Sequence, residues 1–223
     1  MMGTEATRLF EYLPTVIVPA LFATFRMLGI TFVLGTILGV ALAVMLVTTV
    51  EGGLRPNRAL YKSLNFMISV VRSFPVIILI VAVVPLTRLL AGTSIGETAA
   101  IVPLTFAIFP VIARAVETSL NDVPGDVVLA AKSYGASEVQ IVSKVLFVEA
   151  LPGIVSGLTS TLIILLGYTT VAGAVGAGGL GAVALTYGYQ RFDDTIMYSM
   201  VLILFVVVIS IQAAGGVLYR LTR

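Results

Sequence analysis

Residues 127–153 read VVLAAKSYGASEVQIVSKVLFVEALPG and lie between two long apolar blocks. The stretch carries four charged side chains: Lys132, Glu138, Lys144 and Glu149. Charges are costly inside the hydrocarbon of a bilayer, so these residues are expected outside the membrane. Gly135 suits the left-handed position that closes a helix, and Ser137 with Gln140 forms a capping-box pattern that opens the next one. The stretch predicts a helix, a sharp turn and a short second helix.

The second helix is expected from about Glu138 to Phe147. Four apolar residues recur along it at helical spacing, and we expect them on one face: Val139, Val142, Val145 and Leu146. An amphipathic helix of this kind either lies on a lipid surface or binds a protein. Lys144 is its one cation, whereas helices that bind lipid surfaces are usually longer and more basic. A protein partner is therefore the favoured interpretation.

The sequence around this helix is similar to a known loop. Ala130-Ala131, then Gly135, then Glu149-Ala150-Leu151-Pro152 resembles the cytoplasmic "EAA" loop of bacterial ABC importer permeases. In that family the short helix after the glycine is the coupling helix, which docks on a separate ATPase subunit. The resemblance implies a coupling role for ten residues: Ala130, Ala131, Gly135, Ala136, Ser137, Glu138, Val139, Gln140, Ile141 and Val142. Two positions depart from the family pattern, since Leu129 replaces a glutamate and Val148 replaces a proline.

The composition is that of an integral membrane protein. Of the 223 residues, 59% are hydrophobic and 11% are charged, whereas soluble domains have about half and about a quarter. The chain has no cysteine and no histidine, which excludes disulfides, thiolate chemistry, histidine-dependent catalysis and most metal sites. A net charge of +2 without a dense basic run argues against nucleic-acid binding.

The sequence also lacks a means of powering transport by itself. It contains no Gly-x-x-x-x-Gly-Lys-Ser/Thr phosphate-binding loop. The apolar spans lack the buried carboxylate at mid-membrane that ion-driven carriers usually need, and Asp193-Asp194 is interpreted as a solvated acidic pair. We therefore expect a transport subunit rather than an enzyme, with no cofactor or metal, and with ATP hydrolysis on a separate chain.

Five membrane spans are expected, which makes the chain an all-α integral membrane protein. They cover about residues 27–48, 74–90, 98–118, 154–171 and 195–218, with a cytoplasmic coupling loop at 119–153. Residues 1–14 are expected to form a short extracytoplasmic segment. The glycine-rich stretch 171–189 is interpreted as flexible or re-entrant rather than as a sixth span, because each interior glycine costs about 1 kcal/mol of helix stability.

Several residues inside these spans have a structural interpretation and a functional one. Gly35 and Gly39 suit close helix packing, or they reflect the frequency of glycine in membrane helices. Arg72 is expected to reach the membrane interface from the lead-in to the second span, which is favoured over a role as a gate or pathway residue. Arg114 and Glu117 have the spacing of a helical ion pair. Hydroxyl groups in the fourth span either bond between helices or line a polar pathway: Ser156, Thr159, Ser160, Thr161, Thr169 and Thr170.

The distribution of basic residues predicts the orientation of the chain. With five spans and a cytoplasmic C-terminus, nine of the 13 basic residues lie on the inner side: Arg55, Arg58, Lys62, Arg72, Arg114, Lys132, Lys144, Arg220 and Arg223. The other four lie on the outer side: Arg8, Arg26, Arg88 and Arg191. Because cytoplasmic segments are enriched in lysine and arginine, this favours an outer N-terminus and a cytoplasmic C-terminus.

A wider resemblance links the chain to one group of ABC importer permeases. Arg72-Ser73-Phe74-Pro75, Gly92-Thr93-Ser94-Ile95-Gly96 and Val175-Gly176-Ala177-Gly178-Gly179-Leu180-Gly181 resemble segments of the permeases of bacterial methionine importers. The similarity covers about residues 15–214, which would form an ABC transmembrane type-1 domain. A glycine-rich run alone is weak evidence, because glycine betaine permeases have a similar one.

This resemblance implies the fold and assembly of a type I importer. Two copies of the permease would form a homodimer in the bacterial inner membrane and two copies of an ATPase would dock below them. An extracytoplasmic binding protein would deliver L- or D-methionine. No methionine-contacting residue follows from the resemblance. The alternatives are a permease for another small solute, such as glycine betaine or another amino acid, and a non-transporting membrane scaffold.

Overall fold

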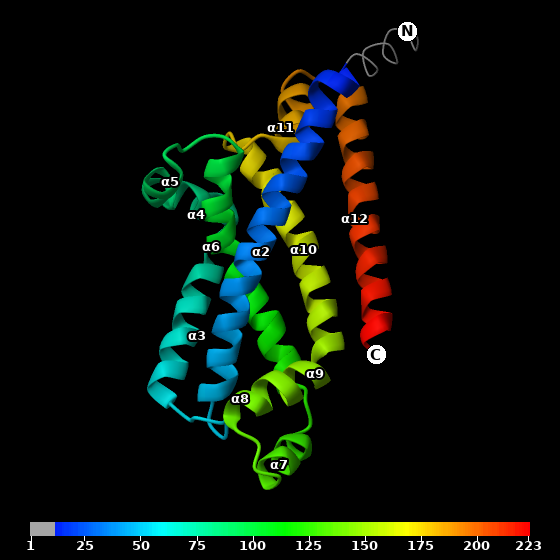
Figure 1. The fold of residues 1–223 in the computed structure, drawn as a ribbon. Coiled ribbons are helices and arrows are strands. Elements are labelled where there is room, and N and C mark those ends of the chain that lie inside the picture. The colour runs from blue at the N-terminus through cyan, green and yellow to red at the C-terminus, as the bar shows by residue number, and fades with distance from the viewer. Residues whose placement is uncertain (1–11) are drawn as a thin grey trace. The chain divides into compact units, whose positions relative to one another are not determined.

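The computed structural model describes residues 12–223, and regular structure in this range is helical (Figure 1). The elements in chain order are η1 (Leu13–Ile17), α2 (Val18–Thr49), α3 (Arg58–Ser73), α4 (Val76–Ala82), α5 (Val84–Ala91), α6 (Glu97–Asn121), α7 (Gly125–Ser133), α8 (Glu138–Gln140), η2 (Ile141–Leu146), α9 (Phe147–Glu149), α10 (Leu151–Ala174), α11 (Gly179–Val183), η3 (Ala184–Tyr189) and α12 (Asp194–Thr222). The three η elements are π-helices. Most of the expected N-terminal segment 1–14 lies outside the described residues.

Four helical stretches are long and apolar enough to cross a membrane: Leu13–Thr49, Glu97–Asn121, Leu151–Ala174 and Asp194–Thr222. A fifth crossing is possible where α3 and α4 meet at a bend of 103°. The expected all-α membrane fold is therefore confirmed. The predicted spans 27–48, 98–118, 154–171 and 195–218 lie within α2, α6, α10 and α12, respectively.

Residues 74–90 do not form the single helix expected for the second span. Pro75 has extended backbone angles (φ −56°, ψ 135°), so α3 ends at Ser73 and α4 begins after the proline. A proline also disfavours helical angles in the residue before it. Pro85 stands in the first turn of α5, where its missing N–H is tolerated. The candidate crossing in this region combines α3 with α4, and Arg72 lies exposed in the last turn of α3.

The glycine-rich stretch contains no candidate span but is more ordered than the sequence suggests. It forms α11 and η3, and Leu180 and Val183 are buried in a cluster with Ile17, Ile196 and Met200. The stretch is therefore helical and packed rather than flexible, and the re-entrant alternative stays a prediction. The small residues that weaken a long helix still permit two short ones, because their packing against neighbours replaces the missing intrinsic helix stability.

The described chain divides into two compact units. One comprises residues up to 33, 74–107 and 162–211; the other comprises residues 34–73, 108–161 and 212–223. The core of the second unit contains Leu42, Leu46, Ile68 and Ala113. Within this unit a Cβ at Gly35 would lie 2.6 Å from Ile108, and one at Gly39 would lie 2.7 Å from Ile112. These two glycines therefore allow α2 and α6 to pack closely.

The hydroxyl groups of α10 bond within their own helix rather than between helices. Five of the predicted residues donate to a carbonyl three or four positions earlier: Thr159, Ser160, Thr161, Thr169 and Thr170. This pattern satisfies a hydroxyl donor inside an apolar helix without a partner helix. These five hydroxyl groups therefore do not donate hydrogen bonds to another helix, which was one of the two interpretations of the residues.

Candidate functional site

The turn between α7 and α8 has the geometry predicted around Gly135. Gly135 has a φ of +79°, and its N–H donates to the carbonyl of Lys132 at 3.0 Å. The N–H of Ala136 donates to the carbonyl of Ala131 at 3.1 Å. This pair of bonds is a Schellman motif, in which a residue with positive φ reverses the chain after a helix. The predicted helix–turn–helix arrangement is confirmed.

The second helix begins with the predicted capping box. The N–H of Ser137 donates to Oε1 of Gln140 at 2.8 Å, and the N–H of Gln140 donates to Oγ of Ser137 at 3.4 Å. From there α8, η2 and α9 follow without a break to Glu149. The helix therefore extends past the expected end at Phe147, and no proline stops it at Val148.

The expected single apolar face of this helix is wrong. Leu146 is buried, as is Ile141, whereas Val139 is 75% exposed. Residues Ile141–Leu146 form a π-helix, whose wider turns break the 3.6-residue spacing on which the expectation depended. The apolar side chains at Ile141 and Leu146 pack against the protein itself. The outer surface of the helix is formed by Val139, Gln140, Ser143 and Lys144.

The ten predicted coupling residues lie within one segment, residues 130–142, and half of them are exposed. Five are exposed: Ala130, Gly135, Ser137, Val139 and Gln140. Four are half-buried: Ala131, Ala136, Glu138 and Val142. Ile141 is buried. Helix α7 has no buried residue, and Tyr134 at its end is 92% exposed. Within residues 12–223, no cluster of acidic side chains is placed to hold a metal ion.

One residue outside the predicted set contacts the start of the second helix. The guanidinium of Arg55 forms an ion pair with the carboxylate of Glu138, the first residue of α8. Arg55 lies between α2 and α3, where its N–H donates to the carbonyl of Thr48 at 2.8 Å. The N–H of Asn57 likewise donates to Thr49 at 2.9 Å. The sequence signalled Arg55 only as a cytoplasmic charge, since no local pattern pairs it with a distant residue.

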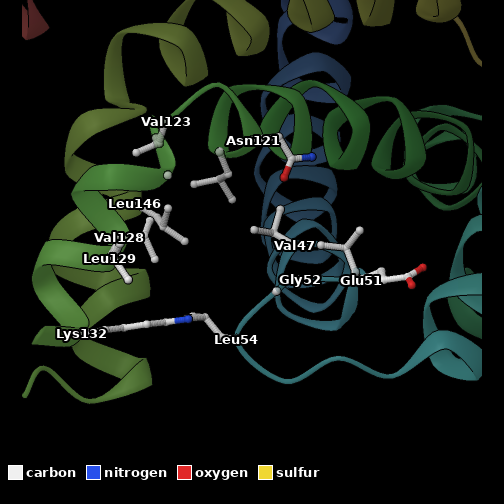
Figure 2. A pocket seen from close by; sticks show the side chains of 14 residues that line it. Val47, Glu51, Gly52, Leu54, Asn121, Val123, Val128, Leu129, Lys132 and Leu146 are labelled. Atoms are coloured by element: carbon white, nitrogen blue, oxygen red, sulfur yellow. The ribbon is translucent and has the colours of Figure 1, made fainter.

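A cavity of about 380 Å³ separates α7 from the end of α2. Figure 2 shows Val128, Leu129 and Lys132 of α7 together with Leu146 on one side, and Val47 with the turn after α2 on the other. The lining is mostly aliphatic: Val47, Val50, Leu54, Leu120, Val123, Val128, Leu129 and Leu146. Because α7 borders this cavity and buries no side chain, few contacts oppose its displacement.

A buried polar group lies elsewhere in the same unit. Nη1 of Arg114 donates to Oε2 of Glu117 at 2.6 Å, as the spacing predicted. Nη2 of Arg114 donates to Oδ1 of Asn65 on α3, a partner that the sequence did not reveal. Nδ2 of Asn65 in turn donates to the carbonyl of Tyr61 at 3.1 Å. These bonds connect α6 to α3, and Glu117 is only 5% exposed.

Comparison with known proteins identifies relatives of the chain. Over 201 residues it is 46% identical to the probable D-methionine transport system permease protein MetI of Vibrio cholerae serotype O1, covering 90% of this chain and 89% of that protein. It is 44% identical over 149 residues to the D-methionine transport system permease protein MetI of Escherichia coli K12, covering 66% of this chain and 69% of that protein.

A solved structure has the same fold. The chain superimposes with a TM-score of 0.93 and 40% identity on a chain of the MetNI methionine ABC transporter in an inward-facing conformation, covering 96% of this chain and 99% of that one. The family model described as "binding-protein-dependent transport system inner membrane component" matches residues 35–223. The chain therefore belongs to the family of inner membrane components of binding-protein-dependent transport systems.

Proposed function

We propose that this chain is the permease subunit of an ABC importer for methionine. The observation that carries the proposal is the match to a methionine ABC transporter chain at 40% identity and a TM-score of 0.93 along nearly the full length of both chains. The relatives from V. cholerae and E. coli, both named as D-methionine permeases, support the same substrate class. The permease forms the membrane path, and ATP hydrolysis takes place on a separate subunit.

The coupling function is assigned to the segment that contains the ten predicted residues. An ATPase subunit would contact its exposed surface, of which Val139, Gln140 and Tyr134 are prominent parts. The helix that ends at Glu149 passes almost directly into α10, because the N–H of Ala150 donates to Leu146 and that of Ile154 to Ala150, both at 2.9 Å. Motion of the coupling segment is thereby transmitted along the chain to α10.

The ion pair of Arg55 with Glu138 supplies a second connection through which motion of the coupling segment reaches the rest of the chain. Arg55 lies in a turn whose backbone bonds to the last residues of α2. A shift of Glu138 therefore pulls on the turn between α2 and α3. In this proposal Arg55 is a positioning residue, since it acts through Glu138 and not on the ATPase itself.

The assembly follows that of a type I importer. Two copies of this chain form a homodimer, two ATPase copies dock at the coupling segments, and an extracytoplasmic methionine-binding protein delivers substrate. Membership of an inner membrane component family and the apolar helices locate the chain in the bacterial inner membrane. The excess of basic residues near the coupling segment supports a cytoplasmic C-terminus and an outer N-terminus.

The test is ATP-dependent uptake of labelled methionine in cells with and without this chain, after other methionine carriers have been removed. Glycine betaine and other amino acids serve as unlabelled competitors. We expect uptake to be lost without the chain and to be inhibited by methionine alone. Uptake that persists without it, or that glycine betaine inhibits equally well, would overturn the assignment of the substrate.

A further inference from the structure

Two helices carry opposite charges, and each charge stands immediately before a long uncharged run. Arg26 directly precedes an uncharged run from Met27 to Val50, and Glu97 directly precedes one from Thr98 to Ala113. The first run extends about 36 Å as a helix, slightly more than the hydrocarbon thickness of a bilayer. Because this run alone can cross the hydrocarbon, we place Arg26 at the level of the lipid headgroups, with the helical residues from Leu13 to Phe25 before it. Since Arg26 and Glu97 are in contact, Glu97 lies at the same level.

The side of α2 that bears Arg26 is apolar and exposed. Phe22 is 70% exposed, and Phe25, Ile30 and Val33 are exposed as well. These positions recur every three or four residues with Arg26 among them, which places them on one side of the helix. That side of α2 is uncovered in the chain itself, which leaves it open to lipid chains. The charged pair thus lies on the open side rather than in the interior of the chain.

The ion pair leaves part of each charged group available to a ligand. Nε of Arg26 donates to Oε2 of Glu97 at 2.9 Å, and Nη2 lies 2.7 Å from the same oxygen. Both contacts use Oε2, so Oε1 of Glu97 and Nη1 of Arg26 lie outside the pair. The side chain of Arg26 is 65% exposed and that of Glu97 29%. A ligand therefore reaches both charges without separating them.

A cavity of about 450 Å³ lies at this pair. Its lining combines the two charges with aromatic and small apolar groups: Pro19, Phe22, Ala23, Phe25, Arg26 and Glu97. The volume is in the range of small-molecule sites. Cation, anion and aromatic surface at headgroup depth together match a molecule that has an oxyanion, an ammonium group and an apolar body.

We propose that this cavity binds a phospholipid with an ethanolamine headgroup. The phosphodiester accepts hydrogen bonds from Arg26, since guanidinium groups are well suited to phosphate. The primary ammonium donates to Oε1 of Glu97, and Phe22 with Phe25 contacts the glycerol and the start of the acyl chains. Glu97 disfavours purely anionic headgroups by charge repulsion. It also disfavours choline headgroups, whose quaternary ammonium has no N–H to donate.

The first experiment uses the permease in its complete complex, reconstituted in nanodiscs with equal amounts of phosphatidylethanolamine, phosphatidylcholine and phosphatidylglycerol. After release into the gas phase, native mass spectrometry counts the lipids that stay bound. We expect phosphatidylethanolamine to be retained roughly threefold to tenfold more than either competitor, the range for one or two charge-assisted bonds at a partly exposed site. Equal retention of all three lipids would overturn the proposal.

Variants then locate the site. Glu97→Gln is expected to abolish the preference for ethanolamine over choline, and Arg26→Gln to lower retention of both lipids. Asp194→Asn and Arg88→Gln are matched controls, because each removes an equivalent exposed charge from the same unit outside the cavity. An unchanged preference in Glu97→Gln, or the same loss in the controls, would contradict the assignment. Displacement of the lipid by free methionine, also a zwitterion, would show instead that the cavity is an amino-acid site.

Discussion

Two ion pairs in one unit of this protein differ in almost every physical respect. The pair of Arg114 with Glu117 lies within α6, is bonded to Asn65 on α3, and has side chains only 29% and 7% exposed. The pair of Arg55 with Glu138 joins the turn after α2 to the first residue of α8, and its side chains are 76% and 42% exposed. The first was evident from sequence spacing, whereas the second was not.

Because the two ion pairs differ in burial, we expect the first to matter for the stability of the fold and the second for coupling to the ATPase. A buried carboxylate that loses its partner destabilises a fold severely, while an exposed pair contributes little to folding. The exposed pair nevertheless connects the coupling segment to the turn after α2. It can therefore be changed without unfolding the protein, and its effect should be visible in transport. Substitutions at the buried pair should lower stability most, and substitutions at increasingly exposed positions should lower it less.

The largest effect on stability is expected from Arg114→Met. It leaves the carboxylate of Glu117, which is 5% exposed, without its cation, at a cost of about 3–5 kcal/mol. Thermal unfolding of the detergent-solubilised protein measures the loss. The double variant Arg114→Met/Glu117→Gln removes both charges and should recover a large part of it. If the double variant is as unstable as the single one, the buried charge is not the cause.

A smaller loss is expected from Gly135→Ala. The φ of +79° at this position costs a residue with a Cβ about 1–2 kcal/mol, although no atom within 4 Å opposes the added carbon. Gly125→Ala is the control, because the space beside it is equally open and its φ is not positive. Amide hydrogen exchange should show faster opening of the turn between α7 and α8 in Gly135→Ala alone. Equal exchange in both variants would contradict the conformational explanation.

The turn at Gly135 and the ion pair inside α6 also show what the sequence could reveal. The turn at Gly135 and the cap at Ser137 were predicted correctly because each is determined by residues within a few positions of each other. The ion pair inside α6 was predicted for the same reason. Family resemblance extended this to the membrane fold. Local chemistry thus identified the candidate site and its internal geometry.

The errors arose where distant residues decide the structure. The π-helix at Ile141–Leu146 turned Val139 to solvent although the 3.6-residue pattern had grouped it with Leu146. The second span, expected over residues 74–90, is divided at Val83 into α4 and α5, and the cost of such a break depends on packing that no local pattern reports. The partners Arg55 and Asn65 were likewise invisible, since each pairs with a residue far along the chain.

The exposed ion pair allows a test by charge reversal. Arg55→Glu places two acidic side chains together and should lower methionine uptake severalfold, with a loss of stability of about 1 kcal/mol or less. Glu138→Arg should do the same. The double variant Arg55→Glu/Glu138→Arg restores the attraction with reversed polarity and should recover uptake. The measurement is uptake per ATP hydrolysed in proteoliposomes that contain the complete complex.

Recovery in the double variant distinguishes positioning from direct contact. If Glu138 contacts the ATPase rather than Arg55, reversal of its charge damages docking, and the second reversal cannot repair it. Arg55→Lys provides a further check, because it keeps the charge and should retain most of the coupling. Loss of uptake in the double variant together with normal uptake in Arg55→Glu would assign Glu138 to the ATPase interface alone.

The smallest effect on stability is expected from Val139→Glu. The side chain is 75% exposed, so the substitution leaves packing unchanged, and surface changes of this kind typically alter stability by about 0.5 kcal/mol or less. A charge at the centre of the proposed docking surface should nevertheless uncouple ATP hydrolysis from uptake. Val142 is half-buried, which makes the same change there ambiguous between misfolding and uncoupling.

Val148→Glu is the matched control, since Val148 is 59% exposed on the same helical segment but lies outside the ten predicted coupling residues. Both variants should unfold at the same temperature as the unmodified protein. Only Val139→Glu should reduce uptake per ATP hydrolysed. Equal uncoupling by both variants would mean that the docking surface extends to α9, and normal coupling in Val139→Glu would remove Val139 from it. Because neither substitution disturbs the fold, either result is a statement about the interface alone.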